Sequence, residues 1–162
     1  MSHQSIIAIV IATINDDLNT YTDLLETLEQ QQQQLIARES HTLGDTARII
    51  TSLLETARSN RQKRSGALSD MGLDNTPEGM EEFIEGLQGK LFEDTSAEWD
   101  ELLNLVEECK QINLINGRTL KLQQKVTEKL LSQMQINTEE RHSYSSKGKS
   151  INQATSTLQV QA

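Results

Sequence analysis

The sequence has few of the residues that build a thick globular core or interrupt a helix. It contains one cysteine (Cys109), one proline and only 3% aromatic residues. A single cysteine excludes an intramolecular disulfide and is typical of a reducing compartment. Cys109 falls on the inward face of a predicted helix, so we interpret it as a small buried apolar residue. The scarcity of proline favours long helices, and the 35% hydrophobic content suits a slender helical bundle.

Long apolar runs and excess basic charge are also missing. The isoleucine-rich stretch at residues 6–14 is shorter than the roughly 20 apolar residues that cross a bilayer. No Lys or Arg precedes this stretch and no Ala-x-Ala site follows it, as a signal peptide would require. We therefore expect a cytoplasmic protein without direct membrane insertion. The net charge of −9 disfavours contact with phosphate backbones, so we expect no nucleic-acid partner.

Catalytic motifs are scarce as well. The pair Glu139-x-x-His142 matches half of the signature of a carboxylate-bridged di-metal bundle, but such a site needs a second pair and two further glutamates. The sequence has no glycine-rich phosphate loop, no Ser/His/Asp set and no Cys/His cluster. We predict a protein that is not an enzyme and that has no metal and no cofactor.

The pattern that is present is a heptad repeat. Its apolar positions predict two long helices, the first with the seam Ile7, Ile11, Ile14, Leu18, Tyr21, Leu25, Leu28 and Leu35, and the second with the seam Leu43, Ala47, Ile50, Leu54, Ala57, Leu68 and Met71. Turn-forming residues at 39–45 separate the two helices, and Gly72 is expected to end the second.

Two more helices are predicted downstream. Thr76-Pro77-Glu78 has the residues of a helix start, which predicts a short helix at 77–92. A third long helix begins near Trp99, with Asp94, Thr95 or Ser96 as its cap. The predicted fold is thus all-α: an elongated antiparallel helical bundle, or coiled coil, of three long helices and one short helix. Its domain spans residues 1–135, and residues 136–162, rich in Ser, Thr, Gln and Lys, are predicted to form a flexible C-terminal tail.

Charge is unevenly distributed along the chain. Arg58, Arg61, Lys63 and Arg64 are compatible with a docking patch, but the favoured interpretation is that their stems cover a thin part of the bundle while their heads stay in water. Between Asp70 and Glu108 there are thirteen acidic residues and one lysine, so this segment carries −12 and the rest of the chain +3. Such a block is usually a solvated face.

The last long helix has an apolar arc over about half of its circumference between residues 113 and 134, wider than the roughly 100° stripe that packing on one layer requires. The extra width predicts a second partner. The candidate binding residues are the apolar Ile115, Leu120, Leu122, Val126 and Leu130, together with Asn113, Asn116 and Gly117. The two amides and the glycine either contact that partner or only set register inside the bundle; the sequence leaves both alternatives open.

Several motifs occur in a fixed order along the chain: Leu43-Gly44-Asp45, the segment 61–72, Trp99 with Leu102 and Leu103, Asn113-x-x-Asn116-Gly117-x-x-Leu120, and Tyr144 followed by Gly148. This ordered set resembles the FlgN family of flagellar export chaperones over nearly the whole chain. Ser145 departs from the family pattern, which commonly has glycine there, and the tail is longer than usual.

The resemblance implies a cytosolic helical chaperone that binds hook-filament junction proteins, prevents their premature association and delivers them to the flagellar export gate. The apolar arc would hold the C-terminal amphipathic helix of such a client. Tyr144 and Gly148 would engage the cytoplasmic domain of the gate. The alternative is a structural coiled-coil adaptor, which should self-associate without a client. The sequence leaves open whether the protein is a monomer or a homodimer and which junction protein it prefers.

Overall fold

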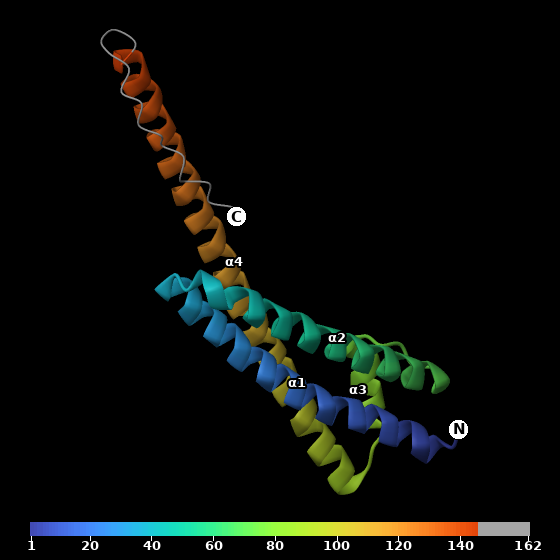
Figure 1. Ribbon diagram of the computed structural model, residues 1–162. Coiled ribbons are helices and arrows are strands. Elements are labelled where there is room, and N and C mark those ends of the chain that lie inside the picture. The colour runs from blue at the N-terminus through green and yellow to red at the C-terminus, as the bar shows by residue number, and fades with distance from the viewer. Residues whose placement is uncertain (146–162) are drawn as a thin grey trace. The chain divides into compact units, whose positions relative to one another are not determined.

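The computed structural model describes the backbone of residues 1–145 and the side chains of residues 1–134. Within this part the chain forms α1 (His3–Ala37), α2 (Ser40–Asp70), α3 (Pro77–Glu85) and α4 (Gly89–Ser145), and no described residue lies in a β-strand (Figure 1). The all-α class, with three long helices and one short helix, is confirmed. The chain divides into two compact units, Met1–Leu120 and Lys121–Ala162.

Helices α1 and α2 form a hairpin in which the two helices run antiparallel and side by side (Figure 1). Arg38 ends α1 in the left-handed conformation, with φ of 56°, and the Glu39 N–H donates to the Gln34 carbonyl at 2.9 Å. The expected turn around Gly44 and Asp45 was wrong, because both residues lie inside α2. The tight turn at Arg38 already satisfies the last carbonyls of α1, so α2 can begin at Ser40.

The next two boundaries match the sequence prediction. Gly72 has φ of 76°, its N–H donates to the Ser69 carbonyl, and the Leu73 N–H donates to the Leu68 carbonyl, both at 2.9 Å. This is the Schellman arrangement that favours glycine after a helix. Thr76 caps α3 by accepting from the Gly79 N–H at 3.1 Å. A Cβ at Gly79 would overlap the Asp74 carbonyl, so this tight turn needs glycine.

Helix α4 is longer than predicted at both ends. It begins at Gly89, which has φ of 58°, whereas the sequence placed its cap at Asp94, Thr95 or Ser96. Thr95 is instead buried within the first turns of the helix. At the other end the helix continues to Ser145, past the predicted start of the tail at residue 136. The predicted short helix at 77–92 is correspondingly shorter in the structure: α3 ends at Glu85, and residues 89–92 belong to α4.

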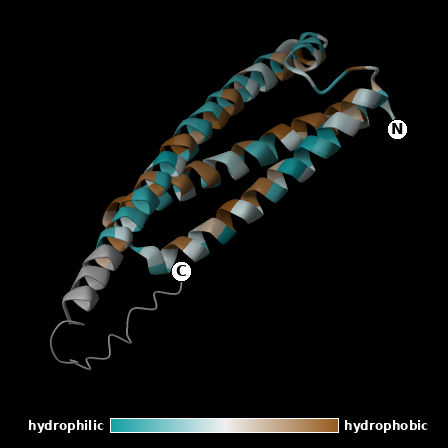
Figure 2. Ribbon diagram, turned by 90° about the horizontal axis from the view of Figure 1, so that it is seen from above, coloured by the Kyte–Doolittle hydropathy of each residue, from teal (hydrophilic) through white to brown (hydrophobic). Residues whose placement is uncertain are grey.

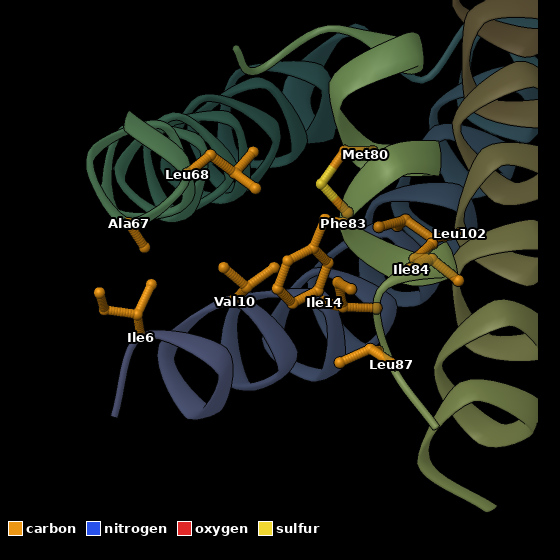
Figure 3. Close-up of a cluster of buried hydrophobic side chains, with 10 residues drawn as sticks. All are labelled: Ile6, Val10, Ile14, Ala67, Leu68, Met80, Phe83, Ile84, Leu87 and Leu102. Carbon is orange, nitrogen blue, oxygen red and sulfur yellow. The ribbon is translucent and has the colours of Figure 1, made fainter. Parts of the chain in front are cut away.

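The main core lies at the end of the hairpin where α3 packs. Figure 3 shows the apolar side chains of all four helices meeting there, with Phe83 of α3 among the residues of α1. The buried members are Ile6, Val10, Ile14, Ala67, Leu68, Met80, Phe83, Ile84, Leu87 and Leu102. The short helix α3 therefore packs against the bundle.

The predicted heptad seams describe the helix faces only in part. In α1, Ile14, Leu28 and Leu35 are buried as expected, but other seam residues are only half-buried. The other buried positions of α1 are occupied by three apolar and five polar residues: Ile6, Val10, Leu24, Thr13, Asp17, Thr20, Thr27 and Gln34. Helix α1 touches α2 on one side and α3 and α4 on another, so its buried surface is wider than one seam. The threonine hydroxyls form hydrogen bonds within α1; Thr27 Oγ1, for example, donates to the Asp23 carbonyl at 2.7 Å.

The placement of Leu54 in the core was wrong, and this correction leads to a stability prediction. Leu54 is 50% exposed, whereas Leu68, on the same helix, is 0% exposed. Leu68→Ala is expected to lower the free energy of unfolding by about 2–5 kcal/mol, the usual cost of a fully buried leucine. The matched variant Leu54→Ala should lose much less. Urea denaturation followed by circular dichroism measures both, and equal losses would contradict this description of the core.

Candidate partner-binding surface

A buried ion pair joins α1 to α2 in the middle of the hairpin. The Asp17 side chain of α1 is 1% exposed, and its Oδ2 accepts from Arg64 Nη1 of α2 at 2.7 Å. Its Oδ1 accepts from Asn60 Nδ2 at 2.9 Å, and Arg64 Nη1 also lies 3.3 Å from Thr13 Oγ1. Both carboxylate oxygens are thus hydrogen-bonded, as a buried charge requires. These polar partners explain why Asp17 tolerates the interior of the bundle.

The same arginine reaches α4. The guanidinium of Arg64 lies over the ring of Trp99, 5.6 Å from its centroid, within the range of a cation–π contact. The interpretation that all four basic residues of the cluster at 58–64 keep their heads in water was therefore wrong for Arg64, which is buried. It holds for Arg58, Arg61 and Lys63, which are exposed. Arg64 thus links three helices. The heptad spacing gave one signal for this role, because Arg61 and Arg64 fall on seam positions of the second helix.

Further along, α4 is attached to α1 at Cys109. This thiol is buried against Leu24 and Leu28, and its Sγ donates to the Tyr21 carbonyl at 3.5 Å. Burial, with a smaller effect from nearby carboxylates, raises the pKa of Cys109 to about 11. The thiol is therefore protonated at neutral pH and acts as a packing residue, as the sequence predicted.

Asn116 provides the next attachment of α4 to α1. Its Nδ2 donates to the Leu28 carbonyl at 2.9 Å and to Gln31 Oε1 at 3.0 Å, and the side chain is buried. The amide therefore forms its hydrogen bonds inside the bundle, as expected if Asn116 sets the register of α4 against α1. Asn113 and Gly117 are exposed, and a Cβ at Gly117 would meet no atom within 4 Å. No described helix therefore approaches α4 closely at Gly117.

The remaining predicted residues are apolar and exposed. In the first unit, Ile115 and Leu120 have 45% and 43% of their surface exposed. In the second unit the exposed residues include Leu122, Val126 and Leu130, with Leu122 at 64%. Their spacing of four places them along one face of the helix, whereas the lysines Lys121, Lys125 and Lys129, which have the same spacing, follow a different face. Hydrophobic and hydrophilic segments alternate along the ribbons of the helices (Figure 2). The second unit thus presents an amphipathic helix whose apolar row is in contact with solvent.

Two predicted residues lie outside this description. Gly148 falls beyond the described residues, and the side chain of Tyr144 lies outside the described range 1–134, as do those of Glu139 and His142. Among the described residues, no group of His, Cys, Asp and Glu side chains is arranged to hold a metal ion. None of the described helices combines the length and hydropathy needed to span a bilayer.

Comparison with known proteins assigns the chain to a family. The sequence pattern of the family described as FlgN protein matches residues 1–151. The chain belongs to the FlgN family. The FlgN resemblance derived from the motifs is therefore confirmed, and it associates the chain with flagellum synthesis.

A solved structure of the same family agrees. It is described as a flagella synthesis protein FlgN from Pseudomonas aeruginosa, has 26% sequence identity, and aligns with a TM-score of 0.61 over 67% of this chain and 84% of its own length. A search of curated proteins gives no significant match. The FlgN assignment thus depends on the family pattern and on this structural similarity.

The two asparagines of the FlgN motif should differ in their contribution to stability. Asn116→Ala removes the donor to Leu28 and Gln31 and leaves their oxygens without it, so the free energy of unfolding should fall by about 1–3 kcal/mol. Asn113→Ala, at an exposed position, should change it by no more than about 0.5 kcal/mol. Denaturant titration of both variants checks this. A similar loss in both would mean that the amide of Asn116 does not hold α4 on α1.

The buried ion pair makes a second prediction. Arg64→Ala leaves the Asp17 carboxylate buried without its cation, so the free energy of unfolding should fall by about 3–5 kcal/mol. Arg61→Ala, an exposed arginine on the same helix, is the matched control and should have little effect. In the double variant Asp17→Ala/Arg64→Ala the loss should be smaller than the sum of the two single losses. Additive losses would show that the two side chains do not interact.

Proposed function

We propose that this FlgN family member is a cytoplasmic flagellar export chaperone that binds hook-filament junction proteins. The observation that carries the proposal is the exposed row of Leu122, Val126 and Leu130 on the second unit. Fully burying each of these side chains would contribute about 1.5–3 kcal/mol. This energy is not used within the described chain, so it is available for a partner.

The partner that fits such a row is an amphipathic helix. Apolar residues at i, i+3, i+4 and i+7 of the partner would pack between side chains spaced by four on α4. The C-terminal amphipathic helices of junction proteins have this chemistry, and covering them would prevent their premature association. Ile115 and Leu120 of the first unit, with Asn113 and Gly117, remain proposed contacts of the same client. Asn116 is the weakest of the predicted contacts, since its amide is already hydrogen-bonded to α1.

We propose in addition that the C-terminal segment delivers the complex to the export gate. Tyr144 and Gly148 are the proposed contacts with the cytoplasmic domain of the gate. An aromatic ring offers a large contact area at low entropic cost, which suits a docking residue near a chain end. Client binding and gate docking would then use different parts of the chain.

A structural adaptor is the second candidate, and the same apolar row favours it if a second copy of the chain covers that row. The two functions differ in what the isolated protein does. An adaptor should form a stable oligomer through Leu122, Val126 and Leu130, whereas a chaperone should bind its client instead. Measuring the mass in solution with and without the client separates the two.

The test compares Leu122→Glu and Val126→Glu with Ile49→Glu, an equally apolar and exposed residue on α2. The first two should lose most of their affinity for a junction protein while the midpoint of thermal unfolding stays unchanged, because neither side chain is buried. Ile49→Glu should bind normally. Tyr144→Ala should keep its client affinity and lose about 1–3 kcal/mol of binding to the gate domain.

Four results would contradict the proposal. Full client binding by Leu122→Glu would exclude the apolar row, and a large drop in its unfolding midpoint would show that the row belongs to the core. If the wild type forms oligomers and the Leu122→Glu variant does not, the adaptor is favoured. Equal gate binding by wild type and Tyr144→Ala would exclude the tyrosine as the docking residue.

A further inference from the structure

The first unit contains a groove that the proposed function does not use. It has a volume of about 260 Å³ and is lined by residues of α1, α2 and α4. All of its residues precede Leu120, so it is separate from the apolar row of the second unit.

The apolar part of the groove comes from two helices. Leu54 of α2 and Leu103 of α4 line it and are each about half exposed, and Val106 lies one turn beyond Leu103. The lining residues of α2 recur at steps of three and four, and so do those of α4. Two helices that each present such a stripe form the seat into which a third helix packs.

The polar part of the groove is basic. Arg58 and Arg61 line it, are exposed, and form no ion pair with any residue that the structure describes. The one acidic residue in the lining, Asp17, is already paired with Arg64. In a chain with a net charge of −9, two unpaired arginines beside leucines create a local attraction for a carboxylate.

A third guanidinium has unused hydrogen-bonding capacity. Arg64 lines the same groove and is only 7% exposed, yet its Nε has no hydrogen-bond partner among the described residues. A buried donor without a partner carries a desolvation cost, which an acceptor from a bound molecule would remove. Arginine is also the residue that holds carboxylates in a two-point geometry.

From these observations we infer that the groove binds an acidic amphipathic helix of a partner protein. Leucine-type side chains of that helix would pack on Leu54 and Leu103, and one glutamate or aspartate would pair with Arg58 and Arg61. This is a second docking surface, distinct from the apolar row on the second unit. Its recognition depends on charge as well as apolar contact, whereas that of the row is apolar.

The test uses the fluorescence of Trp99, which lines the groove and is the only tryptophan in the chain. The probe is a synthetic helical peptide without aromatic residues, with leucines at i, i+3 and i+7 and a glutamate at i+4. It should change the Trp99 emission saturably. A peptide with glutamine in place of the glutamate should bind about tenfold more weakly, because it lacks the charge-assisted hydrogen bonds.

Substitutions on α2 then locate the charge contact. The double variant R58Q/R61Q should bind both peptides equally. The matched double variant R48Q/K63Q removes the same charge from two exposed residues of α2 outside the groove, and it should keep the tenfold preference. The variant L122E should titrate like the wild type, which separates this site from the proposed client surface. Arg64 itself is left unchanged, because its loss would destabilise the bundle by removing the partner of Asp17.

The inference is overturned by an emission that does not respond to the peptides, or by a tenfold preference that survives in R58Q/R61Q. Loss of the response in L122E would place the peptide on the second unit and would also overturn it. The inference is also overturned if the emission changes with protein concentration in the absence of peptide and the mass in solution doubles. A second copy of the chain would then fill the groove. Failure of junction-protein binding in the earlier test would leave all of these readings unaffected.

Discussion

The arrangement of the first unit depends on one buried ion pair, between Asp17 and Arg64. Taking these charges out of water has a large cost, and attraction offsets it only when the geometry is good and the other oxygens are hydrogen-bonded. Asn60 supplies the second bond to Asp17, and Trp99 covers the guanidinium. A purely apolar seam between two long helices could slide by a heptad at modest cost. The ion pair is satisfied in one register only, and its contact with Trp99 extends that register to α4.

The sequence could predict the helices and several of their ends, since these follow from local chemistry. Thr76-Pro77 and Gly72 act through groups a few residues away, and both behave as predicted. The faces of the helices were harder to predict. A heptad assignment takes apolar residues as inward, so it placed Leu54 inside and left Asp17 off the seam. Nothing local distinguishes Asp17 from its neighbour Asp16, because the partner that makes Asp17 tolerable lies 47 residues away.

The sequence predicted the residues of the apolar arc on α4, but not where along the helix this arc becomes exposed. The sequence showed an apolar arc on α4 that was too wide for one neighbour. The structure divides it: Asn116 is the last fully buried residue of α4 among the described side chains, whereas Leu122, Val126 and Leu130 are exposed. Residue types could not indicate where burial ends on α4, because this depends on how far along α4 its contact with α1 extends. Sequence patterns also could not predict that Arg58 and Arg61 lie beside Leu103, since these residues belong to different helices.

The two surfaces follow from how the chain stabilises itself. The core at α3 and the Asp17–Arg64 pair hold the first unit together without the leucines of the second unit, which therefore contribute little to folding. An exposed row of leucine and valine is an aggregation hazard unless it has a partner, and Lys121, Lys125 and Lys129 on the same helix oppose unspecific contact. In the groove, the same guanidinium that fixes the register keeps one donor unused. In the two proposals, stability and recognition are thus connected at Arg64, whereas on α4 they are separated along the helix.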